Sequence, residues 1–133
     1  MKRLMIILTV LISVLAINAS EISQAKLSTA KAMYIRGVKS DNIGLRCNAI
    51  FRIAEMKSRF PEMSTKGVEK ILQKAARKDE NSLVRAYAGL TLVYLKDTKL
   101  NQKVKVIPRE VSIDFYQRLQ QAIYANTYAM NLD

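Results

Sequence analysis

The chain has 133 residues, with 22 lysines and arginines against 11 aspartates and glutamates, so its formal net charge is +11 at pH 7. This charge favours anionic partners, such as acidic proteins, lipid head groups, cell-wall polymers or nucleic acid, over cationic ones. The sequence has no histidine and one cysteine, Cys47, which argues against a transition-metal site and against disulfide staples. The length suits one domain with a modest core.

The N-terminus has the order of features typical of a secretory signal peptide. Lys2 and Arg3 precede a nearly continuous apolar segment, residues 4–17, and small residues follow at 19–20. The apolar segment is shorter than the roughly 20 residues that a membrane-spanning helix needs. We therefore expect residues 1–19 to be removed and residues 20–133 to form a periplasmic or secreted domain. A retained N-terminal anchor is the alternative.

The first two predicted helices are separated by a short polar turn. A helix is expected over residues 22–38, with its apolar side chains on one side and its end near Gly37. The carboxylate of Asp41 is expected to cap the second helix, residues 43–58, by accepting backbone N–H groups of its first turn. Phe60 and Pro61 then end that helix.

The third and fourth predicted helices form the next pair, with Asp79, Glu80 and Asn81 as the turn. The third begins at Pro61 or Ser64 and ends near Lys78. Its apolar residues recur three and four positions apart, a spacing that indicates an amphipathic helix: Val68, Ile71, Leu72, Ala75 and Ala76. The fourth, residues 82–96, is apolar on almost every face, which predicts an inner position between neighbouring helices.

The remaining chain is predicted to close one end of the domain. Residues 97–107 are polar and basic and are expected to form an irregular connection. A fifth helix over residues 112–130 would cover the apolar face of the helix before it. The residues of this helix expected to face inward are Phe115, Leu119, Ala122, Ile123 and Met130.

Two segments of the chain, residues 41–49 and residues 80–88, repeat each other. Each begins at a turn that contains acidic and amide residues. In each, an apolar residue and an arginine follow the turn, and an alanine lies one helical turn after them. The matched positions are Asp41, Asn42, Leu45, Arg46 and Ala49 for the first segment and Asp79, Asn81, Val84, Arg85 and Ala88 for the second. A period of about 40 residues is typical of stacked helix pairs.

These positions resemble the HEAT-repeat family of alpha-solenoids. The resemblance covers residues 41–56 and 79–95 and is absent beyond residue 97. It implies an all-α fold, a short right-handed stack of antiparallel helix pairs with about five helices. It also implies that Arg46 and Arg85 bond the acidic turn residue of their own or the neighbouring repeat, so that Asp41 and Asp79 act as caps and arginine partners.

HEAT-like hydroxylases hold iron with histidine, so their activity does not carry over to a chain without histidine. The register that matches Arg46 with Arg85 places Cys47 on Ala86, which predicts a buried small side chain rather than a reactive thiol. We expect no cofactor, no metal site and no catalytic residues.

Two basic clusters are the candidate binding residues. The first is expected to line the third helix opposite its apolar stripe, and the second lies in the irregular connection. They consist of Lys66, Lys70, Lys74, Arg77 and Lys78, and of Lys99, Lys103, Lys105 and Arg109. Together they could form one anion-binding face, although a solvated helix face is the simpler interpretation.

The sequence therefore predicts an exported, monomeric, non-catalytic binding or adaptor module that recognises an anionic protein or surface. A protein partner is favoured, a lipid surface is the second option and nucleic acid is disfavoured in an exported chain. The alternative is a periplasmic immunity-type inhibitor of a secreted toxin.

Overall fold

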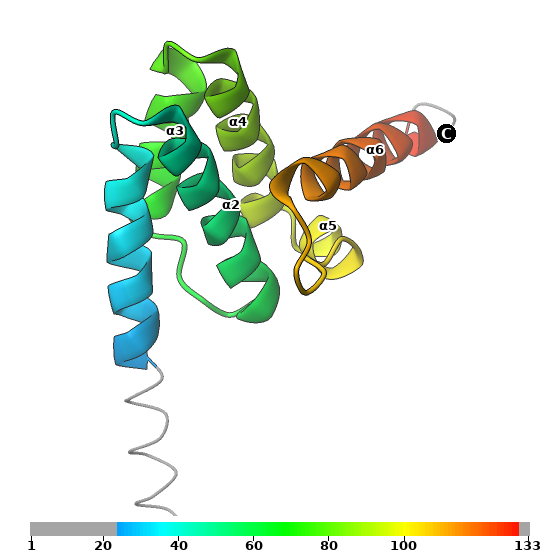
Figure 1. The fold of residues 1–133 in the computed structure, drawn as a ribbon. Coiled ribbons are helices and arrows are strands. Elements are labelled where there is room, and N and C mark those ends of the chain that lie inside the picture. The colour runs from blue at the N-terminus through cyan, green and yellow to red at the C-terminus, as the bar shows by residue number, and fades with distance from the viewer. Residues whose placement is uncertain (1–23, 131–133) are drawn as a thin grey trace, which may run out of the picture. The chain divides into compact units, whose positions relative to one another are not determined.

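A computed structural model describes residues 24–130, and all regular secondary structure in that range is helical (Figure 1). The all-α prediction is therefore confirmed. The predicted signal peptide, residues 1–19, lies outside the described residues. None of the described helices is long and apolar enough to cross a membrane. The chain divides into two compact units after Met33, and the first contributes residues 24–33, which are helical throughout.

The second unit begins with the helical residues 34–38 and contains every element considered below. Its labelled helices are α2 (Ile43–Arg59), α3 (Val68–Lys78), α4 (Ser82–Lys96), α5 (Thr98–Lys103) and α6 (Ser112–Met130). Helix α4 is central, since it packs against α2, α3, α5 and α6. The inner position predicted for this helix is confirmed, although Leu83 and Val93 remain about half exposed.

Asparagine, rather than aspartate, caps the second helix of each pair. The side chain of Asn42 accepts the Leu45 N–H at 3.0 Å, and that of Asn81 accepts the N–H groups of Leu83 and Val84 at 2.9 and 3.2 Å. Both asparagines have extended backbones and directly precede the first helical residue, which is the position whose side chain reaches the free donors. The prediction that Asp41 caps α2 is therefore wrong.

Two boundaries differ from the sequence-based expectation. Helix α3 begins at Val68, not at Pro61 or Ser64, because the chain turns at Gly67 with a φ of 90°, a left-handed conformation that glycine adopts without strain. The connection after residue 97, expected to be irregular, contains the additional helix α5. Asp97 caps α5 by accepting the Leu100 N–H at 2.9 Å, and the buried side chain of Leu100 anchors it.

An aromatic cluster closes the core at the C-terminal end of the stack. It comprises Phe51, Tyr87, Tyr94, Phe115 and Tyr116, and the Tyr87 and Tyr116 rings stack with centroids 3.9 Å apart. The inward positions predicted for Phe115 and Leu119 are confirmed. Ala122 and Ile123 are only half-buried, and the side chain of Met130 lies outside the described residues. The described side chains of α6 therefore pack on the core as far as Ile123.

Gly37 allows the first helix of the second unit to approach α2 closely. A Cβ atom added at Gly37 would lie 2.7 Å from the Cβ of Ala49, which is well inside van der Waals contact. Ala49 is itself buried at the repeat position that Ala88 occupies in α4. Packing against Ala49 thus requires glycine at position 37. This requirement is separate from the position of Gly37 near the end of its helix.

We predict that Gly37→Ala destabilises the protein by about 1–3 kcal/mol, the usual range for overpacking a core contact. Gly89→Ala is the matched control, because an added Cβ there meets no atom within 4 Å and α4 is helical at that point. This control should be neutral or stabilising by up to about 1 kcal/mol. Denaturant unfolding followed by circular dichroism measures both, and equal losses would contradict the close approach.

Candidate functional site

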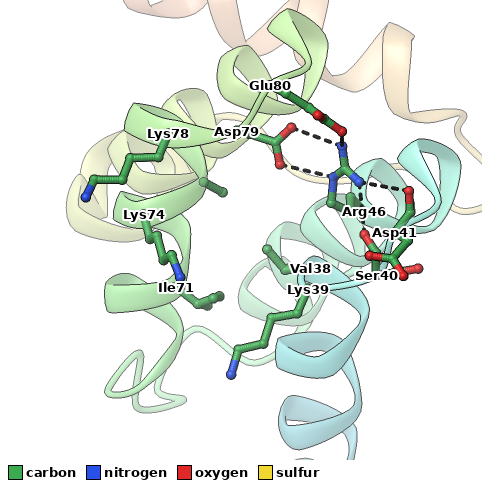
Figure 2. Close-up of a pocket in the computed structure, with 11 residues that line it drawn as sticks. Val38, Lys39, Ser40, Asp41, Arg46, Ile71, Lys74, Lys78, Asp79 and Glu80 are labelled. Carbon is green, nitrogen blue, oxygen red and sulfur yellow. Dashed lines mark hydrogen bonds and ion pairs between the residues drawn. The ribbon is translucent and has the colours of Figure 1, made fainter.

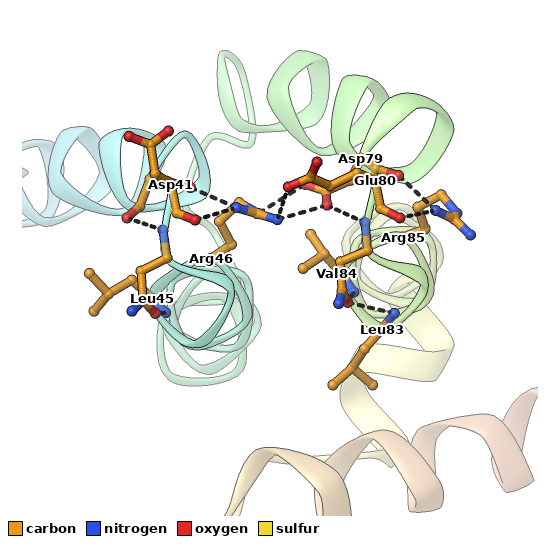
Figure 3. A network of polar contacts seen from close by, with 11 residues as sticks. Asp41, Leu45, Arg46, Asp79, Glu80, Leu83, Val84 and Arg85 are labelled. Carbon is orange, nitrogen blue, oxygen red and sulfur yellow. Dashed lines mark hydrogen bonds and ion pairs between the residues drawn. The ribbon is translucent and has the colours of Figure 1, made fainter.

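The Arg46 guanidinium joins the turns of the two repeats (Figure 3). Its side chain is only 7% exposed. Nη1 donates to the carbonyls of Ser40 and Asp41 at 2.9 and 3.1 Å, and Nη2 donates to Oδ1 of Asp79 at 3.1 Å. Nε lies 3.0 Å from Oδ2 of the same carboxylate as an ion-pair contact. One cation therefore binds the first turn through its main chain and the second through a carboxylate.

The carboxylate of Asp79 has a second task in its own turn. Its Oδ1 accepts the Asn81 N–H at 3.0 Å, directly before α4 begins. The side chain of Asp79 is 11% exposed, so the ion pair with Arg46 is largely shielded from water. Glu80 also approaches Arg46, at 3.7 Å, but its side chain is 87% exposed and its contribution is small.

Arg85 repeats only part of this arrangement. Its Nη1 donates to the carbonyls of Asp79 and Glu80 at 2.7 and 3.0 Å, which matches the bonds of Arg46 to the carbonyls of the turn before α2. Within residues 24–130 it makes no ion pair with an acidic side chain. The predicted link from an arginine to the neighbouring repeat is thus present for Arg46 and absent for Arg85, because the repeat pattern ends before a third acidic turn.

A pocket of about 460 Å³ opens beside this network (Figure 2). Its apolar lining comes from Val38, Ile71 and Ala75. Lys39 reaches it from the turn after residue 38, and Lys74 and Lys78 reach it from α3, on the side away from Arg46. The acidic lining residues, Asp41, Asp79 and Glu80, lie at the Arg46 end.

The structure separates the two predicted basic clusters. Helix α3 carries Lys70, Lys74, Arg77 and Lys78, whereas Lys66 lies in the turn before the helix, so its expected place on the helix is wrong. The second cluster is carried by α5 and the loop that follows it. Figure 1 shows α3 and α5 on different sides of α4. The two clusters are therefore carried by different helices, and their acting as one anion-binding face stays a prediction.

All nine residues of these clusters are exposed, and none forms an ion pair with the described part of the chain. In the second unit, arginines form ion pairs with the carboxylates of Glu55, Asp79, Glu80 and Glu110. Arginine suits such pairs because its planar fork binds a carboxylate with two donors. The lysines of the two clusters consequently keep their full charge available at the surface.

Two contacts that the sequence did not reveal hold the loop of the second cluster. Arg118 donates to both oxygens of Glu110 at 2.7 Å and to the Lys105 carbonyl at 2.9 Å. The Val106 N–H donates to the hydroxyl of Ser58 at 3.0 Å, which attaches the loop to the end of α2. Since these partners are 8 to 48 residues apart, no local pattern could have indicated them.

Cys47 is half-buried and free rather than fully buried. Burial raises the pKa of its thiol, and the nearby Arg46 opposes this shift only in part. The thiol is therefore neutral at pH 7 and a poor nucleophile. Tyr116 is also buried, and burial raises the pKa of its hydroxyl, which shares a 2.7 Å hydrogen bond with Thr91.

Comparison of the chain with protein-family models, with curated proteins and with solved structures gives no match. The resemblance to HEAT repeats therefore rests on the repeated motif and stays a prediction.

We predict that Arg46→Ala costs about 3–5 kcal/mol of unfolding free energy, because it leaves the shielded carboxylate of Asp79 without its cation. Arg85→Ala removes only bonds to main-chain carbonyls and should cost about 1–2 kcal/mol. Lys70→Ala, at an exposed position, should stay within about 0.5 kcal/mol. Thermal and urea unfolding of the three variants gives the order, and a smaller loss for Arg46→Ala than for Arg85→Ala would contradict the assigned roles.

We also predict that Cys47 reacts slowly with a thiol reagent at pH 8. Its raised pKa lowers the thiolate fraction below that of a free cysteine, and partial burial restricts access. The reaction rate in the native protein should rise to that of a model peptide once urea unfolds the chain. A native rate equal to the unfolded one would show an accessible, ordinary thiol.

Proposed function

We propose that this protein is an exported, non-catalytic binding module of the HEAT-repeat type that recognises an anionic protein. The observation that carries the proposal is which charged side chains have ion-pair partners within the protein and which do not. Four of the described carboxylates contact arginines, those of Glu55, Asp79, Glu80 and Glu110, and that of Asp97 caps α5, whereas nine basic side chains in two clusters are exposed without ion-pair partners in the described part of the chain. Such a surface attracts and orients an acidic partner.

The architecture supports a binding role in a second way. A stack of helices held together by internal ion pairs and an aromatic core presents its outer helices as a rigid surface. Helix α3 is one of these outer helices, since it packs on α4 and exposes its lysines to water. A rigid surface loses little conformational entropy on binding, which favours recognition of a partner over catalysis.

The location outside the cytoplasm is proposed from the charged, apolar and small residues of the N-terminus. A protein partner is favoured over a lipid surface because the exposed charges are carried by two different helices, α3 and α5, and their neighbouring loops, whereas a flat membrane engages one side of a domain at a time. The immunity-type inhibitor is a special case of this proposal, in which the anionic partner is the active-site region of a toxin.

We predict that binding to an acidic polypeptide, with polyglutamate as the probe, weakens steeply as salt is added. Exposed charges are screened over a Debye length of about 8 Å at physiological ionic strength. Reversing the charge of Lys70, Lys74, Lys103 and Lys105 should abolish binding and change the melting temperature little, because all four side chains are exposed and the bond of Lys105 Nζ to the Ser58 carbonyl is long, at 3.5 Å. Anisotropy titrations measure the affinity.

Salt-insensitive binding, or full binding by the quadruple variant, would overturn the proposal. Vesicles containing phosphatidylglycerol serve as the second probe. Vesicle binding that is stronger than polyglutamate binding would identify a membrane surface as the partner instead.

A further inference from the structure

Helix α3 carries a straight row of cationic side chains. Lys70, Lys74 and Lys78 are four residues apart, so they lie one above another on one side of the helix. With a rise of about 1.5 Å per residue, neighbouring lysines are about 6 Å apart along the axis. Lys39 lines the same pocket as Lys74 and Lys78 but comes from the turn after residue 38 (Figure 2).

This spacing matches an extended polypeptide. In a strand, side chains two residues apart point to the same side and are separated by about 6.6 Å. Carboxylates at every second position of an extended segment can therefore meet successive lysines of the row. We infer that the row formed by Lys70, Lys74 and Lys78, with Lys39 opposite, binds an extended acidic segment of a protein partner with carboxylates at alternate positions.

Hollows at both ends of the row give such a segment a place to lie. One is the pocket of about 460 Å³, whose lining combines Lys39, Lys74 and Lys78 with the apolar side chains of Val38 and Ile71. The other lies beside Lys66 and Lys70 and includes the buried side chain of Met63. The alternate side chains of a bound strand that do not meet lysine would be directed away from α3.

The acidic residues of the pocket do not neutralise its lysines. Asp79 is occupied by Arg46 and by the Asn81 N–H, and Glu80 also approaches Arg46. Asp41 lies at the Arg46 end, away from Lys74 and Lys78 (Figure 2). The three lysines have no ion-pair partner among the residues that the structure describes, so an incoming carboxylate displaces only water.

Other anionic occupants match less well. A helical partner with acidic residues four apart would have the same spacing, but such like-charge pairs destabilise an isolated helix, whereas repulsion extends an acidic chain. A single-stranded nucleic acid needs aromatic side chains on which its bases stack, and neither hollow has one in its lining. Protein carboxylates are thus the favoured ligand of this row.

The test uses two fluorescent heptapeptides with the same composition, three aspartates and four serines. In the first, Asp-Ser-Asp-Ser-Asp-Ser-Ser, the carboxylates alternate, and in the second, Asp-Ser-Ser-Asp-Ser-Ser-Asp, they fall three residues apart and on different sides of an extended chain. The purified protein should bind the alternating peptide at least about fivefold more tightly, the effect of roughly one surface ion pair. Equal affinities, or no binding of either peptide, would overturn the inference.

Matched variants assign the binding to the row. Lys74→Gln should weaken binding of the alternating peptide by about fivefold, whereas Lys99→Gln, the same charge change on α5, should alter it by less than about twofold. Equal losses would show unspecific attraction and overturn the inference. A single-stranded oligonucleotide of similar charge that binds more tightly than the peptide, and loses affinity in Lys74→Gln, would also overturn it.

The inference rests on the proposed function, but the two fail differently. If polyglutamate binds in a salt-sensitive way and Lys74→Gln has no effect, the protein is an anion-binding module whose site lies elsewhere. If neither polyglutamate nor the peptides bind, both proposals are wrong. Circular dichroism of each variant confirms that the fold is kept, which is expected because both substituted side chains are exposed.

Discussion

The contact on which the second unit depends most is the bond of the Arg46 guanidinium to two turns that are distant from each other in sequence. A cation with a side chain 7% exposed is costly to bury, and the cost is offset only when its donors find acceptors. Here two main-chain carbonyls and one carboxylate supply them. Because each acceptor lies in a turn, the same interaction sets the distance between consecutive helix pairs.

Arginine and lysine have different tasks in this chain. Arginines at positions 46, 52, 59 and 118 hold carboxylates inside the molecule or along helix surfaces, where a planar fork with several donors is effective. The lysines of α3 and α5 are exposed and unpaired within the described chain. Four acidic side chains, those of Glu55, Asp79, Glu80 and Glu110, are bound by arginines rather than by these lysines, whereas Glu69 lies on α3 beside Lys70.

The sequence predicted those parts of the fold that depend on residues close together in the chain. The spacing of apolar residues located α2, α4 and α6 closely, and the repeated motif located the contact between Arg46 and Asp79 but wrongly implied an equivalent one for Arg85. The cap was misassigned by one residue because aspartate and asparagine are adjacent in the turn and both accept N–H groups. Lys74 and Lys78 were candidate binding residues from sequence, but Lys39 was not, since nothing local indicates that its turn faces α3.

The rest of the fold could not be predicted, because it depends on contacts distant in sequence. Helix α5 has one strongly buried apolar residue, Leu100, and so lacks a detectable period. The loop after α5 is held by Ser58 and Arg118 from other elements. Tyr124, directly after Ile123 on α6, is 57% exposed and is not part of the core.

The network that stabilises the stack also positions the proposed binding row. Lys39 directly precedes Ser40, whose carbonyl accepts from Arg46, and Lys78 directly precedes Asp79, whose carboxylate binds the same guanidinium. The two walls of the pocket are therefore held apart by one buried side chain, while the lysines on them remain free to meet a ligand. The stabilising network and the exposed charges lie within a few residues of each other, so a change that loosens the stack should also shift Lys39 relative to Lys74 and Lys78, while the spacing of the row within α3 is kept.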